Sequence, residues 1–132
     1  MPDSWTPERR RDERRDVPFP LYARVRVGSD ADDARVRVRG VSVGGMVLES
    51  PGLLPVNQRA SVVLSGPDGD IGPLAGCIVH SRLVLAPHRN AASAYIAGLA
   101  FDSLPAASAD AIEALLFSIA QHPSSRNTRQ LP

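Results

Sequence analysis

The feature that most constrains this fold is an alternation of apolar residues with polar ones, mostly arginine, which occurs twice near the start of the chain. Apolar side chains take every second position in 21–27, and alanine or valine alternates with arginine in 34–39. Successive side chains of a β-strand point to opposite faces, so this period predicts two half-buried strands. The intervening GSDADD, at 28–33, is rich in turn-forming residues, and we expect the strands to pair as a hairpin.

Four further strands are expected downstream. The apolar segments lie at 46–48, 60–64, 74–85 and 94–101, and a Gly/Pro/Asp turn is expected at 66–73. Because closing an antiparallel sheet on itself removes its exposed edges, six short strands favour a closed barrel.

One amphipathic helix is expected after the last strand. Apolar residues recur there at helical spacing, at Ile112, Leu115, Leu116 and Ile119. Ser108 is the expected N-cap, Asp110 is expected in the first turn, and Pro123 should end the helix.

The 132 residues provide for one domain with polar ends. Residues 1–20 carry four prolines and many arginines, which predicts a flexible arm with little regular structure. The expected barrel and helix occupy 21–121, and 122–132 is an expected disordered tail.

Several classes of function lack their signatures. His80, His88 and His122 have no cysteine or acidic partners at metal-ligand spacing, and no phosphate loop, GxSxG or HExxH motif occurs. We therefore expect no enzyme, cofactor or metal. A single cysteine, Cys77, suggests a cytoplasmic protein, and the apolar runs are too short for membrane insertion.

An arginine-rich run in the arm is the first candidate binding element. Residues 8–16 hold five arginines and four acids, with arginines four apart in two registers, Arg10/Arg14 and Arg11/Arg15. Guanidinium groups can fork onto phosphate oxygens or onto guanine O6 and N7. A self-paired, solvated charge run has the same composition, so the run alone leaves both interpretations open.

The order of motifs along the chain resembles the PilZ domain, a bacterial receptor for cyclic di-GMP. The resemblance combines the RxxxR arm, two strands and a Ser-x-Gly-Gly turn with AGCIVH at 75–80 and AGLAFDSLP at 97–105, followed by the helix. It covers about residues 9–120. It implies a six-stranded antiparallel PilZ-like barrel with a C-terminal helix, whose arm folds over the ligand.

The resemblance also implies a second motif, DxSxxG, on the barrel surface. Here it reads Gly40-Val41-Ser42-Val43-Gly44-Gly45, so glycine replaces the acidic or amide residue. Losing that contact to guanine would cost about 1–3 kcal/mol. The hydroxyl of Ser42 and the backbone of Gly44 and Gly45 remain as expected contacts.

Outward-facing arginines of the expected hairpin form a second basic feature, the basic strip, which consists of Arg24, Arg26, Arg35, Arg37 and Arg39. Such a strip is usually a solvated surface, but Arg39 directly precedes the glycine turn and could extend the anion site. Like charges facing each other across strands need acidic neighbours to offset their repulsion.

These features predict a cyclic di-GMP receptor that signals by ordering its arm and acts on an unidentified protein partner. Arg10 and Arg14 are the preferred grips, and Arg11 and Arg15 form the second register. One alternative is a degenerate adaptor that has lost the ligand, consistent with Gly40. Another is a nucleic-acid-binding barrel, which we do not expect because the near-neutral net charge of +1 and the few aromatic residues argue against it.

Overall fold

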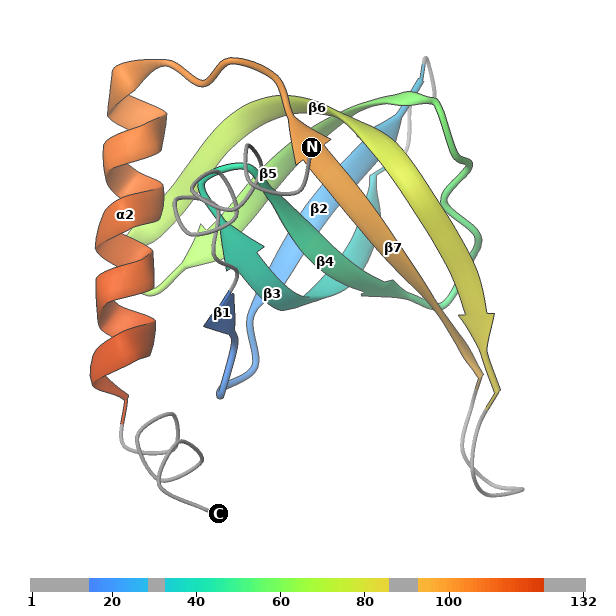
Figure 1. The fold of residues 1–132 in the computed structure, drawn as a ribbon, viewed down its shortest axis with the longest axis horizontal. Helices are drawn as coiled ribbons and strands as arrows, with labels where there is room; N and C mark the ends of the chain where they lie inside the picture. The colour runs from blue at the N-terminus through green and yellow to red at the C-terminus, as the bar shows by residue number, and fades with distance from the viewer. Residues whose placement is uncertain (1–14, 29–32, 86–92, 123–132) are drawn as a thin grey trace, which may run out of the picture.

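A computed structural model describes residues 15–28, 33–85 and 93–122, which form seven strands and one helix (Figure 1). The elements are β1 (Arg15–Asp16), β2 (Tyr22–Val27), β3 (Ala34–Ser42), β4 (Gly45–Ser50), β5 (Arg59–Gly66), β6 (Gly69–Val84), β7 (Ala94–Phe101) and α2 (Ala106–Gln121).

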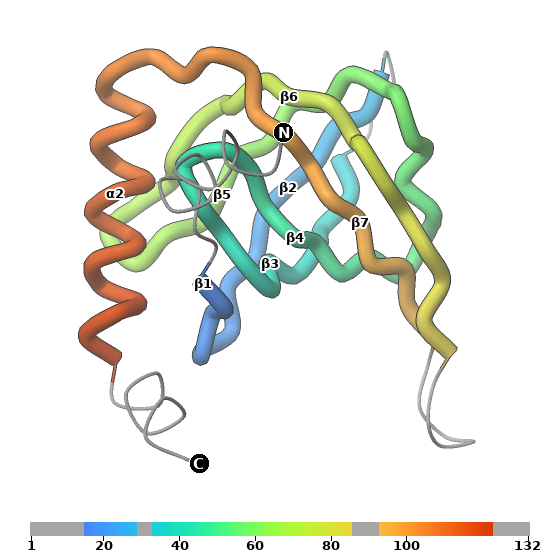
Figure 2. The backbone as a smooth tube through the Cα atoms, in the orientation of Figure 1, coloured from blue at the N-terminus to red at the C-terminus, as the bar shows by residue number. Residues whose placement is uncertain are grey.

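Six of the strands close into an antiparallel barrel. Neighbours follow the order β3-β2-β5-β6-β7-β4, and β4 pairs back onto β3 to complete the circle. The backbone tube in Figure 2 shows the long strand β6 curving around the barrel from β5 to β7. The predicted six-stranded barrel with a C-terminal helix is confirmed.

Strands β1 and β2 share one edge of β3. Tyr22 of β2 faces Arg37, in the first half of β3, whereas Asp16 of β1 faces Gly40, in the second half. Between them lie Pro18 and Pro20, which have no backbone N–H to donate to the ladder. Within the predicted arm, 1–20, the described residues contain a single short strand, β1, and residues 1–14 lie outside the described part of the chain.

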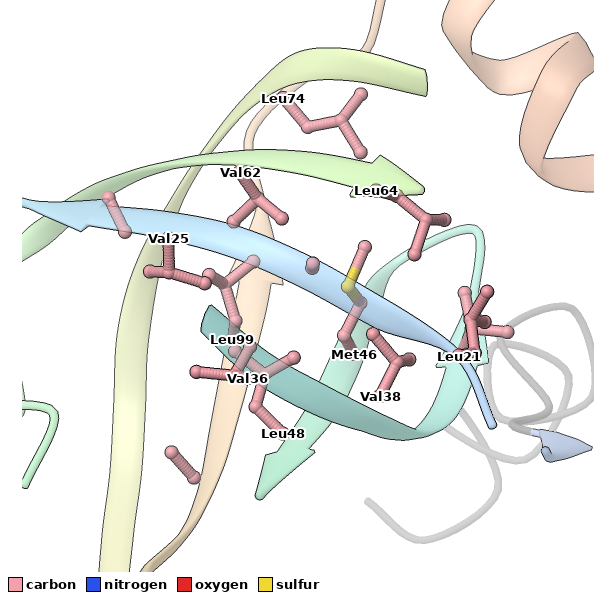
Figure 3. Packing of buried hydrophobic residues seen from close by; sticks show 14 of the residues in the cluster. Leu21, Val25, Val36, Val38, Met46, Leu48, Val62, Leu64, Leu74 and Leu99 are labelled. Atoms are coloured by element: carbon pink, nitrogen blue, oxygen red, sulfur yellow. The ribbon is translucent and has the colours of Figure 1, made fainter. Parts of the chain in front are cut away.

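The core fills the barrel interior with aliphatic side chains (Figure 3). The alternation seen in the sequence is reproduced in burial, since Ala23 and Val25 of β2 and Val36 and Val38 of β3 are all buried. Large side chains from the remaining strands complete this core: Met46, Leu48, Val62, Leu64, Leu74, Ile78 and Leu99.

Helix α2 stands against one end of the barrel (Figure 1) and buries Ile112, Leu115 and Ile119. The predicted N-cap at Ser108 and the first-turn position of Asp110 were wrong, because the helix begins at Ala106. Pro105 takes the N-cap position with φ −59° and ψ 152°, and its carbonyl accepts the N–H of Ala109 at 3.0 Å. No side chain caps this end, so the helix begins earlier than the capping pattern indicated.

The predicted turn over 66–73 is shorter than expected. Gly66 already pairs with Gly69, and β6 runs on from there. Two residues of β6 are accommodated opposite Val63 by a register shift, where Gly72 adopts a φ of +130°. Glycine is favoured at such a φ. The glycine and proline that suggested a turn therefore form a bulge within β6.

In the described part of the chain, no helix is both long and apolar enough to cross a membrane.

Candidate functional site

The hairpin turn between β3 and β4 is organised by one hydroxyl group. The Oγ of Ser42 accepts the backbone N–H groups of Gly44 at 3.1 Å and Gly45 at 3.2 Å, and it lies 3.4 Å from the carbonyl oxygen of Gly45, to which it can donate. The side chain is only 2% exposed. The hydrogen bonds of this hydroxyl are all made within the turn, so Ser42 stabilises the conformation of the turn.

Gly45 is required by close backbone packing. A Cβ atom at this position would lie 2.1 Å from the carbonyl oxygen of Leu99 in β7, a distance that no side chain tolerates. Gly44, at the tip of the turn, is half-buried. The absence of a side chain at Gly45 therefore lets the turn approach β7 directly.

Gly40 is buried at an irregular point of β3, where its register with Val47 turns it to the outer side of the barrel. The pairing between β3 and β4 shifts register between Val38 and Gly40, and the next residue, Val41, points into the core. The backbone is therefore irregular just before Gly40 and turns tightly between Ser42 and Gly45. With glycine at this position, the outer face of β3 has no side chain there.

Five residues lie side by side across five strands, in a line that we call the outer row. Each faces the next in the strand register: Asp16 of β1, Gly40 of β3, Val47 of β4, Gly98 of β7 and His80 of β6. Val47 is half-buried between the core residues Met46 and Leu48, so it points outward. The outer row therefore has two positions without side chains, bounded by a carboxylate at one end and an imidazole at the other.

The imidazole of His80 leans across its neighbouring strand. A Cβ atom on Gly98 would lie 2.2 Å from His80 Nε2 and 2.5 Å from Cε1, so the ring occupies the space above Gly98. His80 itself remains exposed. A flat, solvent-accessible ring thus lies over β7 next to Val47.

The end of the arginine-rich arm reaches this site. Arg15 pairs with Val41 in the ladder between β1 and β3 and is half-buried. Arg10, Arg11 and Arg14 lie outside the described residues. Of the four arm arginines that were predicted to contact the ligand, the structure thus places one, Arg15, next to the β3–β4 turn.

Most of the basic strip is neutralised by carboxylates. Arg24 pairs with Asp70 at 3.4 Å, Arg26 with Asp33 at 3.1 Å, and Arg39 with Glu49 at 3.1 Å. Arg24 also faces Arg35 directly across the β2–β3 ladder, as the hairpin prediction required. These pairs supply the acidic neighbours that a like-charged strip needs, and Arg39 is held by Glu49 beside Gly40.

The two other arginines of the strip border a hollow of about 390 Å³ on the outside of the barrel. The guanidinium carbon of Arg35 lies 4.3 Å from the ring centroid of Tyr22. Arg37 is the residue paired with Tyr22 in the β2–β3 ladder. The Arg39–Glu49 pair separates this hollow from the outer row, since Glu49 lines the hollow and Arg39 adjoins Gly40.

Two residues of the outer row, Asp16 and His80, were not predicted as site residues from the sequence. Asp16 was part of the arm's charge run, and its position opposite Gly40 depends on a strand pairing between distant segments. From the sequence, His80 was considered only as a metal ligand, and it has no cysteine or acidic partner at metal-ligand spacing. A register shift between Ile78 and His80 turns it outward, which alternation alone does not indicate.

Over the described residues, no group of three or more histidine, cysteine, aspartate or glutamate side chains could hold a metal ion.

Comparisons with known proteins identify the fold. The PilZ domain model matches residues 8–118, and no curated protein sequence matches this chain. The solved PilZ domain with c-di-GMP of YcgR from Escherichia coli has a TM-score of 0.71 and 18% identity, over 93% of this chain and 99% of that chain.

Two further solved structures are similar over about half their own length. The MrkH-c-di-GMP complex from K. pneumonia has a TM-score of 0.71 and 18% identity, over 93% of this chain and 56% of that chain. The inhibitor of motility MotI/DgrA from Bacillus subtilis has a TM-score of 0.58 and 15% identity, over 90% of this chain and 51% of that chain. At these identities the structural similarities support the fold.

Proposed function

Because the chain belongs to the PilZ domain family, we propose that it is a cyclic di-GMP receptor that binds its ligand without chemical turnover. The observation that carries the proposal is the position of the outer row. The outer row, which lacks a side chain at two of its positions, lies beside the β3–β4 turn. The end of the arginine-rich arm pairs with β3 at Val41 and Gly40. Two solved neighbours, those of YcgR and MrkH, are described as c-di-GMP complexes.

Arginines of the arm supply the attraction for the doubly charged ligand in this proposal. Arg10 and Arg14 grip phosphate and guanine, and Arg11 and Arg15 form the second register. Charge-assisted, forked hydrogen bonds are among the strongest that side chains make. The pairing of Arg15 with Val41 brings this arginine beside the β3–β4 turn and the outer row.

The turn residues act by shaping the surface. Ser42 holds the turn through its hydroxyl, and Gly45 lets the backbone pack closely against β7. The carbonyl of Gly44 accepts the N–H of Phe101 at 2.8 Å. Arg39 borders the ligand beside Gly40, with its charge partly offset by Glu49.

Ligand capture signals by ordering the arm over the barrel and so changes the surface offered to a protein partner. Trypsin cleaves after arginine, and the run 9–15 contains five arginines. Saturating cyclic di-GMP should slow tryptic cleavage within 9–15. Equal cleavage rates with and without bound ligand would contradict the ordering step.

A degenerate adaptor without ligand is the second candidate, and the glycine at position 40 favours it. Replacing Gly40→Asp distinguishes the two. In a receptor, wild type already binds and the added carboxylate should tighten binding somewhat. In an adaptor, wild type should not bind, and the variant should either stay silent or gain binding from nothing. Thermal melting of the variant checks that the added side chain leaves the fold intact.

A role in nucleic-acid binding is not proposed, because the basic strip is largely paired with carboxylates. Gel-shift assays with mixed oligonucleotides at physiological salt should show no complex.

Isothermal titration calorimetry tests the proposed function directly. Cyclic di-GMP should bind at tens of micromolar protein, and chromatography should recover the ligand unchanged after prolonged incubation. Absence of binding would contradict the receptor function, and hydrolysis of the ligand would contradict a role without turnover.

A further inference from the structure

The outer row contains a carboxylate in a position to compensate for the glycine at residue 40. This inference rests on the proposed function, because it concerns how the guanine bases of that ligand are recognised. A guanine base presents two donors side by side, N1–H and N2–H₂, on its Watson–Crick edge. A carboxylate is the natural complement, since its two oxygens accept two parallel hydrogen bonds.

The pairing between β1 and β3 places Asp16 directly opposite Gly40. One residue further along the same ladder, Val17 donates its N–H to the carbonyl of Arg39 at 3.0 Å. Hydrogen-bonded and non-hydrogen-bonded positions alternate along an antiparallel ladder, so Asp16 and Gly40 occupy a non-hydrogen-bonded position. At such positions the Cα atoms are closest, about 4.5 Å apart, and the two side chains project from the same face. The carboxylate of Asp16 therefore emerges beside the space where a side chain of residue 40 would lie.

The carboxylate of Asp16 is also available to accept hydrogen bonds from a ligand. It is exposed and has no ion-pair or hydrogen-bond partner among the described residues. Glu49, the other acid near Gly40, is held by Arg39. The remaining carboxylates in ion pairs of the described part are committed elsewhere: Asp33 to Arg26, Asp70 to Arg24 and Asp102 to Arg59.

We propose that Asp16 accepts the N1–H and N2–H₂ groups of a guanine base lying over the outer row. The acidic acceptor of this site thereby comes from β1, directly opposite Gly40, which has no side chain of its own. Asp16 is a specificity-determining residue in this arrangement, because a carboxylate pairs with the donor edge of guanine. Adenine presents an acceptor at N1 and has no N2 amino group.

The direction in which Asp16→Asn changes the affinity for cyclic di-GMP distinguishes this role from a purely electrostatic effect. The ligand carries two negative charges, so an exposed carboxylate that does not contact it should only repel it. Asp16→Asn would then leave binding unchanged or tighten it slightly. If Asp16 accepts from guanine, the same substitution should weaken binding despite the removal of like charge.

The experiment is a calorimetric titration of cyclic di-GMP into wild type, Asp16→Asn and Asp16→Ala. Both variants should lose about 5- to 150-fold in affinity, with the larger loss for alanine, which keeps no acceptor. The control is Asp70→Asn, which also removes an exposed carboxylate but lies at the β5–β6 turn, and it should bind like wild type. Circular dichroism and thermal melting confirm that all variants are folded.

A second measurement tests base selectivity. Cyclic di-AMP should bind wild type much more weakly than cyclic di-GMP, and Asp16→Asn should narrow that difference. Unchanged or tighter cyclic di-GMP binding by a folded Asp16→Asn overturns the assignment of Asp16. If wild type itself does not bind cyclic di-GMP, the proposed function fails instead, so the two failures are distinct.

Discussion

Single residues around the β3–β4 turn have separable structural and binding roles. Ser42 and Gly45 are engaged in the turn and its packing against β7, whereas Asp16 and His80 are exposed at the two ends of the outer row. Substitutions at the first pair should therefore act on stability, and substitutions at the second pair on ligand affinity.

Gly45→Ala should destabilise the fold. The new Cβ would lie 2.1 Å from the backbone carbonyl of Leu99, so the β4–β7 pairing must shift. We expect a loss of about 1–3 kcal/mol in the free energy of unfolding, measured by urea denaturation. Gly52→Ala is the matched control, because nothing lies within 4 Å of its added atom, and it should change stability by less than about 0.5 kcal/mol. Equal effects of the two substitutions would contradict the close packing.

His80→Ala should weaken cyclic di-GMP binding about fivefold or more, because the exposed ring over Gly98 offers a stacking surface for a base. Gly98→Ala should weaken binding as well, since its Cβ displaces the ring. The double variant should then bind no more weakly than His80→Ala alone, as measured by calorimetry. Additive losses would show that the two substitutions act independently.

Strands whose signals are local were predicted well from the sequence. Alternation in 21–27 and 34–39 indicated β2 and β3, and the sixth predicted strand has the same bounds as β7, Ala94–Phe101. Strand β1 was missed because it has only two residues and its pairing with β3 joins segments about 25 positions apart in the chain. The start of α2 was misplaced because Pro105 begins the helix without a side-chain cap.

Only part of the candidate site could be found in the same way. Ser42, Gly44 and Gly45 lie in one short motif, and the structure confirms that they form a tight turn. The approach of Asp16 and His80 to opposite ends of one row depends on four strand registers and a register shift at His80. Those features arise from the closed barrel, and the sequence contains no local signal for them.

An ion pair links the start of β5 to the end of β7. Arg59 forms a bidentate interaction with Asp102, and one of its contacts, Nη1 to Oδ1, measures 3.2 Å. The hydrogen bond from Arg59 is the main cause that lowers the pKa of Asp102 below its ordinary value and raises the pKa of Arg59. Both side chains are exposed, so the contribution to stability should be small.

Asp102→Asn should lower the Tm by no more than a few degrees near neutral pH. A carboxylate with a lowered pKa in the folded state contributes stability above its unfolded pKa, about 3.9, and loses it as the pH falls through the folded pKa. The difference in Tm between wild type and variant should therefore be constant from pH 7 to 5 and shrink below about pH 4. Thermal melts across this range would contradict the role of the pair if the difference grew on acidification.

The whole molecule combines a closed barrel with a site on its outer face. The five residues of the outer row all belong to β-strands, and the pairing of those strands around the core aligns them. The arginine-rich arm is connected to the barrel through β1, which pairs with β3 at Val41 and Gly40 (Figure 1). We therefore expect ligand binding to leave the strand pairing of the barrel unchanged and to order the arm.

The most direct test is a calorimetric titration of cyclic di-GMP into wild type, Arg10→Ala/Arg14→Ala and Arg11→Ala/Arg15→Ala. Wild type should bind, and the first double variant should lose about 100-fold or more in affinity, since it removes two charge-assisted contacts. The second double variant should lose much less. Wild-type protein that gives no binding signal at tens of micromolar, or a first double variant that binds as tightly as wild type, would contradict the account.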